Sequence, residues 1–398
     1  MPRILFVHHT SQLGGAENSL VELVKVLEPP YEAIVACPSP ASPSPCVERG
    51  QGSSPPSPSP CVERGQGSLV ERLQSLGVAV EPVPIIRFKR TSNPVILARY
   101  LTAWRRGART LARIVRRDAI DLIHSNSTTA HIYGSAAAKR TGVPSVWHVR
   151  DVAIPSIGSI VAMPRLSRNS ACVAISRFIA ERLKAAAGID AEVIYNGVDL
   201  QRFHPSEHAP DAPVVTMVAQ MVPWKGQRDF LQAAAIVRRS VPTAAFRLIG
   251  SDLFDDRPQY RTFLRTLAQK LELGDGVEFT GYRADVPDVL RSSTLLVLPS
   301  REEPFGRVVI EAMASGLPVA AYDEGGPAEI IVDEQTGLLT PPGDVPALAA
   351  AIVRLLMNPG EAARFGRAGR QRAVEMFDSR DTARKIMALY SRMLGSTP

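Results

Sequence analysis

The stretch from Leu298 to Glu311, LPSREEPFGRVVIE, is the part of this 398-residue chain that says most about its fold. It continues the short apolar strand candidate Leu295 to Pro299, passes through a polar loop, and enters a helix at about Gly306. In open α/β sheets, ligands bind at the loops that follow the carboxyl ends of the strands. The stretch therefore predicts an α/β fold with a binding loop at this position.

The same alternation of short β-rich runs with longer helical stretches extends in both directions. In the first half the strand candidates are Arg3 to His8, Ala33 to Cys37, Asp121 to His124, Pro144 to His148, Ala171 to Ile175 and Glu192 to Tyr195. After the proline-flanked stretch Pro205 to Pro213 they are Val214 to Ala219, Ala245 to Ile249, Val277 to Thr280, Leu295 to Pro299 and Pro318 to Ala321. This pattern predicts two parallel, doubly wound α/β domains.

Length and composition agree with this division. A chain of 398 residues exceeds what one core usually organises, and 45% hydrophobic residues with 21% charged residues exclude a disordered chain. We expect an N-terminal domain at 1–205, a C-terminal domain at 206–378, and a helix in 379–398 that can pack back on the N-terminal domain. No apolar run reaches the length of a membrane span, so a cytoplasmic protein is predicted.

One segment interrupts the alternation. Ser42 to Ser53, SPSPCVERGQGS, recurs unchanged as Ser57 to Ser68 within a proline-rich region. Such a repeat has nothing to bury against its copy, so we interpret 38–68 as a duplicated, disordered loop insertion.

Several chemistries are excluded by missing motifs. The sequence has no HExxH, no Gly-Lys phosphate loop, no GxSxG, no GxGxxG opening a helix, no Asp-x-Asp and no CxxC. These absences argue against zinc proteases, P-loop NTPases, serine hydrolases, nicotinamide dehydrogenases and metal-dependent sugar transferases. No metal site is expected.

Two carboxylates flank the predicted helix start. Glu303 lies in the loop and Glu311, eight residues on, lies inside the helix. A helix N-terminus offers free N–H groups and a partial positive charge, which suit a diphosphate, and carboxylates accept hydrogen bonds from sugar hydroxyls. On spacing alone, two solvated glutamates are the simpler interpretation.

Further motifs change that balance. The stretch is followed by AMASGLP (Ala312 to Pro318) and GGPAEII (Gly325 to Ile331), and preceded by QLGGAE (Gln12 to Glu17), YNGVD (Tyr195 to Asp199) and VAQMVPWKG (Val218 to Gly226). In this order they closely resemble the signatures of the retaining glycosyltransferases of family 4. The resemblance implies the GT-B fold, in which two Rossmann-like domains face an inter-domain cleft.

The resemblance also implies roles for individual residues. Glu303 would hold hydroxyls of the transferred sugar, Glu311 the ribose and Lys225 the diphosphate, and His148 would lie at the reacting centre. The donor site implied comprises Gly14, Gly15, Gln220, Lys225, Glu303, Phe305, Gly306, Arg307 and Glu311. His148, Glu303 and Lys225 are the expected catalytic residues.

Gln220 stands where the family usually has an arginine, and the sequence does not decide whether Arg307 or Arg301 compensates. Three other positions have simpler interpretations. Gly14 and Gly15 by themselves fit an ordinary loop, and a lone histidine such as His148 is usually structural. A strand end at an open crevice nevertheless favours a ligand contact for His148.

The expected reaction is transfer of a sugar from a UDP- or GDP-linked donor to a lipid-linked or polysaccharide acceptor, with attack on the face that the phosphate leaves. No cofactor and no nucleic-acid partner are expected. A nucleotide-sugar 2-epimerase of the same fold and a non-catalytic binding scaffold are the alternatives, the Gln220 replacement being the one hint of the latter.

The segment from Arg87 to Arg117 holds ten basic residues and no acidic one. At helical spacing in Pro94 to Arg117 an apolar stripe is formed by Leu101, Trp104, Ala108, Leu111, Ala112 and Val115, and the flanking arginines are Arg105, Arg109, Arg113, Arg116 and Arg117. This pattern fits an anionic membrane surface. It fits equally well a domain helix whose stripe faces the core.

Overall fold

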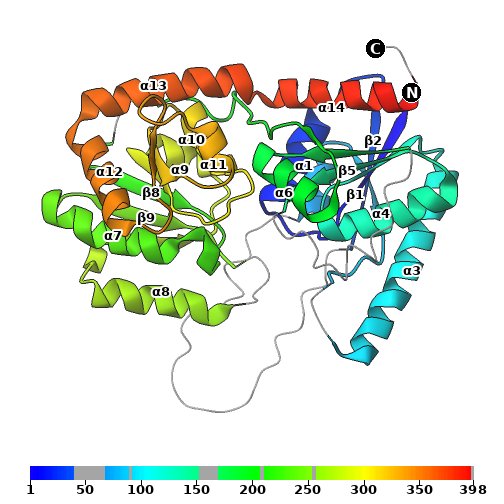
Figure 1. The fold of residues 1–398 in the computed structure, drawn as a ribbon, viewed down its shortest axis with the longest axis horizontal. Coiled ribbons are helices and arrows are strands. Elements are labelled where there is room, and N and C mark those ends of the chain that lie inside the picture. Colours follow the sequence, from blue (N-terminus) through cyan, green and yellow to red (C-terminus); the bar gives the residue numbers. More distant parts are fainter. Residues whose placement is uncertain (40–67, 89–91, 152–168, 207–209, 253–256, 396–398) are drawn as a thin grey trace.

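The computed structural model describes residues 1–39, 68–88, 92–151, 169–206, 210–252 and 257–395. Two α/β domains lie side by side, each built on one parallel sheet with helices on both faces (Figure 1). The predicted loop insertion at 38–68 falls almost entirely outside the described residues. Its last residue, Ser68, caps helix α2 by accepting a hydrogen bond from the Glu71 N–H.

The N-terminal sheet has seven strands in the order β3-β2-β1-β4-β5-β6-β7, and every neighbouring pair is parallel. Its strands are β1 (Arg3–Val7), β2 (Glu32–Cys37), β3 (Ala79–Pro82), β4 (Leu122–Ser125), β5 (Ser145–Val149), β6 (Ser170–Ala174) and β7 (Glu192–Val193). The helices are α1 (Gly15–Lys25), α2 (Leu69–Gln74), α3 (Pro94–Arg117), α4 (Thr128–Thr141) and α6 (Arg177–Ala187). The direction of winding reverses between β1 and β4, which makes their carboxyl ends the expected binding edge.

The C-terminal sheet repeats this plan with six parallel strands in the order β10-β9-β8-β11-β12-β13. They are β8 (Val214–Val218), β9 (Ala245–Ile249), β10 (Val277–Gly281), β11 (Leu295–Leu298), β12 (Val319–Tyr322) and β13 (Leu338–Thr340). The helical segments are η2 (Pro223–Lys225), α7 (Gln227–Ser240), α8 (Pro258–Lys270), η3 (Gly274–Gly276), α9 (Val286–Arg291), α10 (Arg307–Ala314), α11 (Gly326–Ile330) and α12 (Val345–Met357). Here the winding reverses between β8 and β11.

The two parallel, doubly wound domains confirm the predicted fold class. The strand prediction lacked β3 and β13, which both lie at an edge of their sheet. β3 consists of exposed and partly buried residues, and β13 has three residues. Neither presents the continuous apolar run of a central parallel strand.

The chain crosses between the domains twice, and the two crossings touch. The linker residue Val198 accepts a hydrogen bond from the Ser379 N–H and donates its own N–H to the Phe377 carbonyl at 2.7 Å. A Cβ atom on Gly197 would lie 2.3 Å from Ser379 Cα, so only glycine allows this approach. The crossings therefore form one narrow, hydrogen-bonded hinge.

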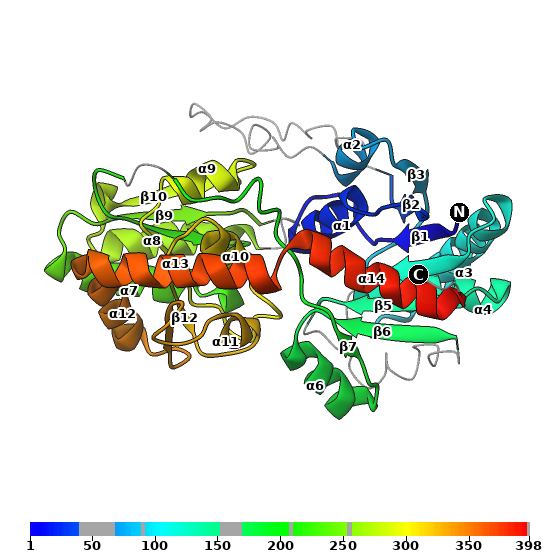
Figure 2. The ribbon, with the colours of Figure 1, turned by 90° about the horizontal axis from the view of Figure 1, so that it is seen from above.

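Two long helices complete the structure: α13 (Pro359–Met376) and α14 (Ser379–Leu394). They run nearly end to end, α13 along the C-terminal domain and α14 along the N-terminal domain (Figure 2). On its buried face α14 presents Ala383, Ile386, Leu389 and Tyr390. These side chains join the core formed by Ile4, Phe6 and Leu20, so the last helix completes the first domain.

Candidate active site

The loops after β8 and β11 bring Lys225 and Glu303 together at the switch point of the C-terminal sheet. Lys225 Nζ lies 2.6 Å from Glu303 Oε2, and the side chains are 16% and 7% exposed. The ammonium group also lies 4.1 Å from the centre of the Trp224 ring. The pair is mostly shielded from water, so its attraction is stronger than that of a surface ion pair.

The start of α11 packs against the backbone of the loop that carries Glu303. The Gly326 N–H donates to the Glu303 carbonyl at 2.8 Å. A Cβ atom on Gly326 would lie 2.2 Å from Phe305 Cα, and Phe305 itself is buried. This close backbone packing explains the glycines of the GGPAEII motif, and it sets the position of Glu303.

Gly306 precedes α10 with a φ of 91°, in the left-handed region. No side chain in the described part of the chain caps this helix start. The Val309 N–H donates to the Gly306 carbonyl at 2.9 Å, whereas the Arg307 and Val308 N–H groups have no hydrogen-bond partner among the described residues and can receive an anion.

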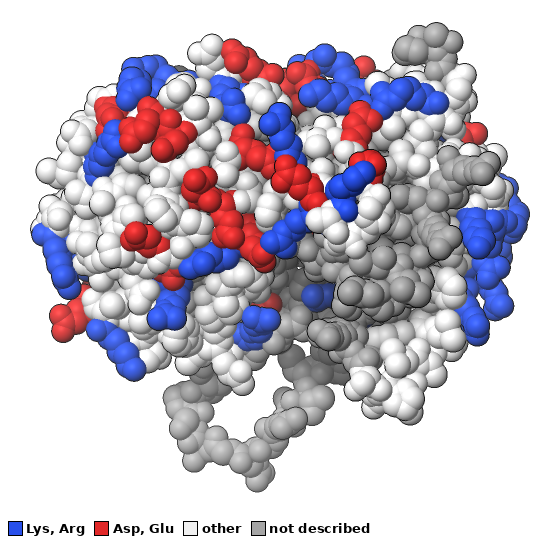
Figure 3. Space-filling model, in the orientation of Figure 1, with Lys and Arg blue, Asp and Glu red and all other residues white. Residues whose placement is uncertain are grey.

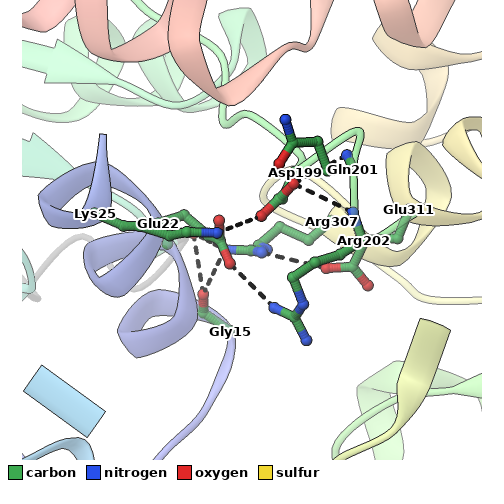
Figure 4. A network of polar contacts seen from close by, with 9 residues as sticks. Gly15, Glu22, Lys25, Asp199, Gln201, Arg202, Arg307 and Glu311 are labelled. Atoms are coloured by element: carbon green, nitrogen blue, oxygen red, sulfur yellow. Dashed lines mark hydrogen bonds and ion pairs between the residues drawn. The ribbon is translucent and has the colours of Figure 1, made fainter. Parts of the chain in front are cut away.

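Arg307 and Glu311 form an ion pair one turn apart on α10, at 3.2 Å. Arg307 also reaches across to α1 in the N-terminal domain, where it donates to Ser19 Oγ at 2.6 Å and to the Gly15 carbonyl at 3.5 Å. Figure 4 shows Arg307 between Glu311 and Gly15. Two further ion pairs in the same view tie α1 to the linker: Lys25 with Asp199 at 2.7 Å and Glu22 with Arg202 at 3.2 Å. Arg307 therefore acts between the domains as well as beside Glu311.

Arg307 and Arg301, the two arginines considered as replacements for the one missing at Gln220, have other partners. Arg307 is bound as just described, and the Arg301 guanidinium lies over the Tyr322 ring at 5.8 Å. Gln220 accepts a hydrogen bond from Gln227 with its main-chain carbonyl. In the described part of the chain, Lys225 is thus the cation that contacts Glu303 directly.

On the opposite domain, Gly14 precedes α1, which has no side-chain cap among the described residues. A Cβ atom on Gly15 would meet none of the described atoms within 4 Å. Packing thus places no demand on Gly15, and the space beside it is open to a ligand.

His148 on β5 is 1% exposed and lies in a buried polar network. Its Nδ1 atom lies 3.2 Å from His124 Nε2 and 3.2 Å from Arg150 Nη2. Arg150 is also bonded to Asn126 and Asn196, so in the described structure its hydrogen bonds all go to neutral groups. Burial lowers the pKa of Arg150 to about 9, and burial together with the Arg150 charge holds the pKa of His148 well below its usual range.

Two family models divide the chain between them. The model described as Glycosyltransferase Family 4 matches residues 13–202, and the one described as Glycosyl transferases group 1 matches residues 201–372. A D-inositol 3-phosphate glycosyltransferase of Gordonia bronchialis is 30% identical over 69% of this chain and 67% of its own length. The chain belongs to glycosyltransferase family 4. The resemblance inferred from the motifs is thereby confirmed.

Another similar member of the family is a GDP-mannose-dependent alpha-(1-6)-phosphatidylinositol monomannoside mannosyltransferase of Mycolicibacterium smegmatis, 31% identical over 58% of this chain. The match spans 64% of that relative's length, slightly under two thirds. Among solved structures, Anabaena HepE in complex with UDP and glucose has a TM-score of 0.78 at 25% identity, covering 98% of this chain and all of HepE. The sucrose-phosphate synthase of Thermosynechococcus elongatus has a TM-score of 0.80 at 21% identity, covers both chains fully, and shares the fold.

The family motifs do not reveal every polar group at the site of this glycosyltransferase. His124, Asn196 and Tyr390 belong to the His148 network and were missed. His124 ends a predicted strand beside the one that ends at His148, and that parallel placement was a usable signal. Tyr390 had none, because it lies on the last helix.

A second missed group lies where β1 leads into α1. His8, His9 and Glu17 place three possible metal-ligand atoms within 4.8 Å of one another, whereas the sequence led us to expect no metal site. His8 Nε2 and Glu17 Oε1 are 2.5 Å apart. Burial by itself would raise the pKa of Glu17, but the contact with His8 outweighs it and leaves that pKa lowered. A hydrogen-bonded pair accounts for His8 and Glu17 without a metal.

Helix α3 turns most of the predicted apolar stripe toward the domain core, as the simpler interpretation expected. Ala108, Leu111, Ala112 and Val115 are buried, and Trp104 packs partly buried against that core, where its Nε1–H donates to the Ile132 carbonyl at 3.3 Å. Toward the N-terminal end the exposed apolar residues are Val95, Ile96, Leu97 and Leu101, at 75%, 38%, 48% and 45%. Basic side chains gather at the edge of the domain where α3 and α4 lie (Figure 3). None of the helices in the described ranges has both the length and the apolar character to cross a bilayer.

Proposed function

We propose that this family 4 glycosyltransferase moves a sugar from a nucleotide-sugar donor to an acceptor with retention of anomeric configuration. The observation that carries the proposal is the shielded Lys225–Glu303 pair at the switch point, next to the uncapped start of α10. A cation and free N–H groups suit a diphosphate, and a carboxylate suits sugar hydroxyls.

The pair has a direct mechanistic use. Without donor, Lys225 and Glu303 neutralise each other at 2.6 Å. When the donor binds, Lys225 turns to the diphosphate, whose negative charge grows as the sugar leaves, and Glu303 accepts hydrogen bonds from the sugar. Lys225 thereby stabilises the transition state more than the ground state, which is the condition for faster turnover.

Retention by attack on the face that the phosphate leaves needs no protein nucleophile. The leaving phosphate itself takes the proton of the acceptor hydroxyl, and the protein holds the ion-pair-like transition state. His148 and the glycine loop at Gly14 and Gly15 form the facing wall of this centre.

The donor class proposed is UDP- or GDP-linked, and the acceptor class lipid-linked or polysaccharide. Two findings support it: UDP and glucose are bound in HepE, and the Mycolicibacterium relative is named for GDP-mannose and a phosphatidylinositol acceptor. A thermal-shift screen over nucleoside diphosphates identifies the base, because a ligand at 100 times its dissociation constant stabilises by roughly 2.7 kcal/mol.

Product analysis tests the reaction. We expect nucleoside diphosphate to be released only when donor and acceptor are both present, and the new glycoside to keep the donor's anomeric configuration. An isomerised donor would instead indicate a 2-epimerase, and donor binding without turnover a scaffold. Lys225→Ala is the negative control for release.

We also propose that the reaction needs no metal, because Lys225 and the α10 start supply the positive charge. Incubation with EDTA should leave turnover unchanged. The His8, His9 and Glu17 group supplies the control: if EDTA abolishes activity and magnesium or zinc restores it, His9→Ala should abolish the restoration. That result would replace this part of the proposal with a metal-dependent mechanism.

We further propose that α3 attaches the enzyme to an anionic surface at the inner face of the plasma membrane, through the exposed apolar residues of its N-terminal half and the exposed arginines along its length. Exposed apolar residues beside exposed arginines support this, since each basic residue near such a surface contributes about 1 kcal/mol. In liposome sedimentation, binding should rise with anionic lipid and fall with salt. It should weaken in the Arg105, Arg109 and Arg113 to Glu triple variant.

The matched control for this membrane test reverses three exposed arginines on the last two helices, Arg364, Arg367 and Arg384. Both triple variants change the net charge equally. If both triple variants lost vesicle binding equally, the net charge of the protein, and not α3, would be responsible for binding. If equal amounts of the native protein stayed in the supernatant with neutral and anionic vesicles, the attachment would be ruled out.

A further inference from the structure

A line of buried rings joins the C-terminal helix to His148. Tyr390 on α14 lies with its hydroxyl oxygen 2.6 Å from His124 Nδ1. On the other side of that ring, His124 Nε2 lies 3.2 Å from His148 Nδ1. Tyr390 and His124 are fully buried, and His148 and Arg150 are 1% and 6% exposed. Water therefore has little access to any of these bonds.

Arg150 determines the direction in which the protons point. A guanidinium carries only donors, and Arg150 Nη2 lies 3.2 Å from His148 Nδ1, so this nitrogen must be the acceptor. His124 Nε2 faces the same lone pair and must carry a proton. His124 Nδ1 is then the bare nitrogen, and it accepts from the Tyr390 hydroxyl. The opposite direction would set two lone pairs or two protons against each other at one of these contacts.

We propose that Tyr390 is a positioning residue of the active site: acting through His124, and together with Arg150, it holds His148 as the Nε2–H tautomer. His148 then offers the bound ligand a hydrogen-bond donor and cannot act there as a base. The inference rests on the proposed function, which places His148 at the reacting centre. It assigns to the last helix a part in the chemistry of the first domain.

Two observations support this assignment. His148 Nε2 is buried and has no hydrogen-bond partner among the residues that the structure describes. His148 lines a small cavity together with Ser19, Glu22, Arg150 and Asn196, among others. A buried N–H without a partner is costly, so a ligand oxygen at this place gains a bond that the free enzyme lacks.

Burial and the charge of Arg150 keep the His148 ring neutral. Arg150 and His124 contact this ring, His131 on α4 lies nearby, and Glu22 on α1 lines the same cavity. His131 is itself bonded to Ser125 and stacked on Trp147. Because the ring stays uncharged, the position of its single proton decides what His148 can do.

The chain offers a matched control in Tyr31. Its hydroxyl is also buried against α14, where it bonds Ser391 Oγ at 2.6 Å and the Met387 carbonyl at 3.2 Å. Its ring packs edge-on to that of Tyr390. Tyr390→Phe and Tyr31→Phe therefore remove the same group from the same helix interface, but only Tyr390→Phe breaks the line to His148.

The decisive measurement is the ¹⁵N spectrum of the full chain labelled at histidine, which distinguishes Nδ1–H from Nε2–H rings. At pH 7.5 we expect His124 and His148 to be protonated at Nε2. Tyr390→Phe should shift the His124 Nδ1 and His148 signals and lower kcat roughly tenfold, with the KM for the donor nearly unchanged. Tyr31→Phe should leave the histidine signals in place and kcat within about twofold.

A proton on His148 Nδ1 in the unaltered protein would overturn the inference directly, whatever the activity. Equal losses in the two tyrosine variants would also overturn it, because they would show a merely structural effect. If His148→Ala turned over at the native rate, the proposed place of His148 in the reaction would fail, and with it the positioning role of Tyr390. The spectrum of the unaltered protein would still establish the tautomer.

Discussion

The two domains share a strand order but place different chemistry at their switch points. The C-terminal domain sets two ion pairs there, Lys225 with Glu303 and Arg307 with Glu311, whose four side chains are between 7% and 16% exposed. The N-terminal domain sets a buried group there, in which the hydrogen bonds of Arg150 go to the neutral side chains of His148, Asn126 and Asn196. One side can respond to developing charge, whereas the other offers hydrogen bonds that are fixed by burial. A transferase needs both, one for the leaving diphosphate and one for orientation.

The largest expected difference between the two domains is in how their stability changes at acidic pH. Burial and nearby charges lower the pKa of His131 to about 3, and those of His124 and His148 also lie well below their usual value. The unfolded chain binds protons at these residues below about pH 6.5, whereas the folded protein does not, so stability falls as the pH falls. His9, whose pKa burial lowers to about 4, belongs to the same group, and from pH 7.5 to 5.5 the four histidines together should cost about 5 kcal/mol.

Hydrogen exchange corrected for intrinsic rates locates this loss. Amide protection in β4 and β5 should fall between pH 7.5 and 5.5, while protection in β8 and β11 changes little. In His131→Phe, which keeps a ring stacked on Trp147, about one quarter of the pH dependence should disappear. An equal loss of protection in both domains would contradict the contrast drawn here.

The next largest effect is expected on turnover, when one side chain is removed from the site of either domain. We expect Lys225→Ala, Glu303→Ala and His148→Ala each to lower turnover by at least about two orders of magnitude, because each removes a preorganised contact to the transition state. Steady-state kinetics on folded, purified variants measures this. Near-native rates would remove the residue concerned from the mechanism.

The smallest effect is expected for the hydrogen bond that joins the sites of the two domains, between Arg307 and Ser19. Arg307→Ala should lower kcat/KM by about tenfold, because it removes a charge-assisted hydrogen bond between α10 and Ser19 on α1. Ser19→Ala removes the same bond but keeps the Arg307–Glu311 pair. Similar losses in both variants would show that the inter-domain bond matters, and a loss confined to Arg307→Ala would show that Arg307 acts on the donor.

Arg354→Ala is the control for general charge loss. This arginine pairs with Glu334 and Glu361 entirely inside the C-terminal domain. Its removal should change kcat/KM by less than about twofold, since such exposed pairs contribute little.

Much of the fold could be predicted from local pattern. The central strands of both sheets are short apolar runs because both of their faces are covered, and parallel strands must be joined by helical crossovers. The signature from Leu298 to Glu311 likewise placed Glu303 in a loop and Glu311 in a helix, where the structure has them. Edge strands such as β13 were not predicted, because the position of a strand at the edge of a sheet is decided by neighbours that are distant in the sequence.

The sequence by itself determined the alternation of strands and helices, the family, and the residue types able to bind a sugar diphosphate, because periodicity and motif spacing are local properties of the chain. Only the tertiary structure decided which groups meet. Lys225 and Glu303 are 78 residues apart, and Tyr390 and His124 are 266 residues apart. Such contacts arise when the order of strands in a sheet and the return of the last helix bury apolar faces together. No local pattern encodes those distances, so the direction of the protons at His148 becomes visible only in the folded chain.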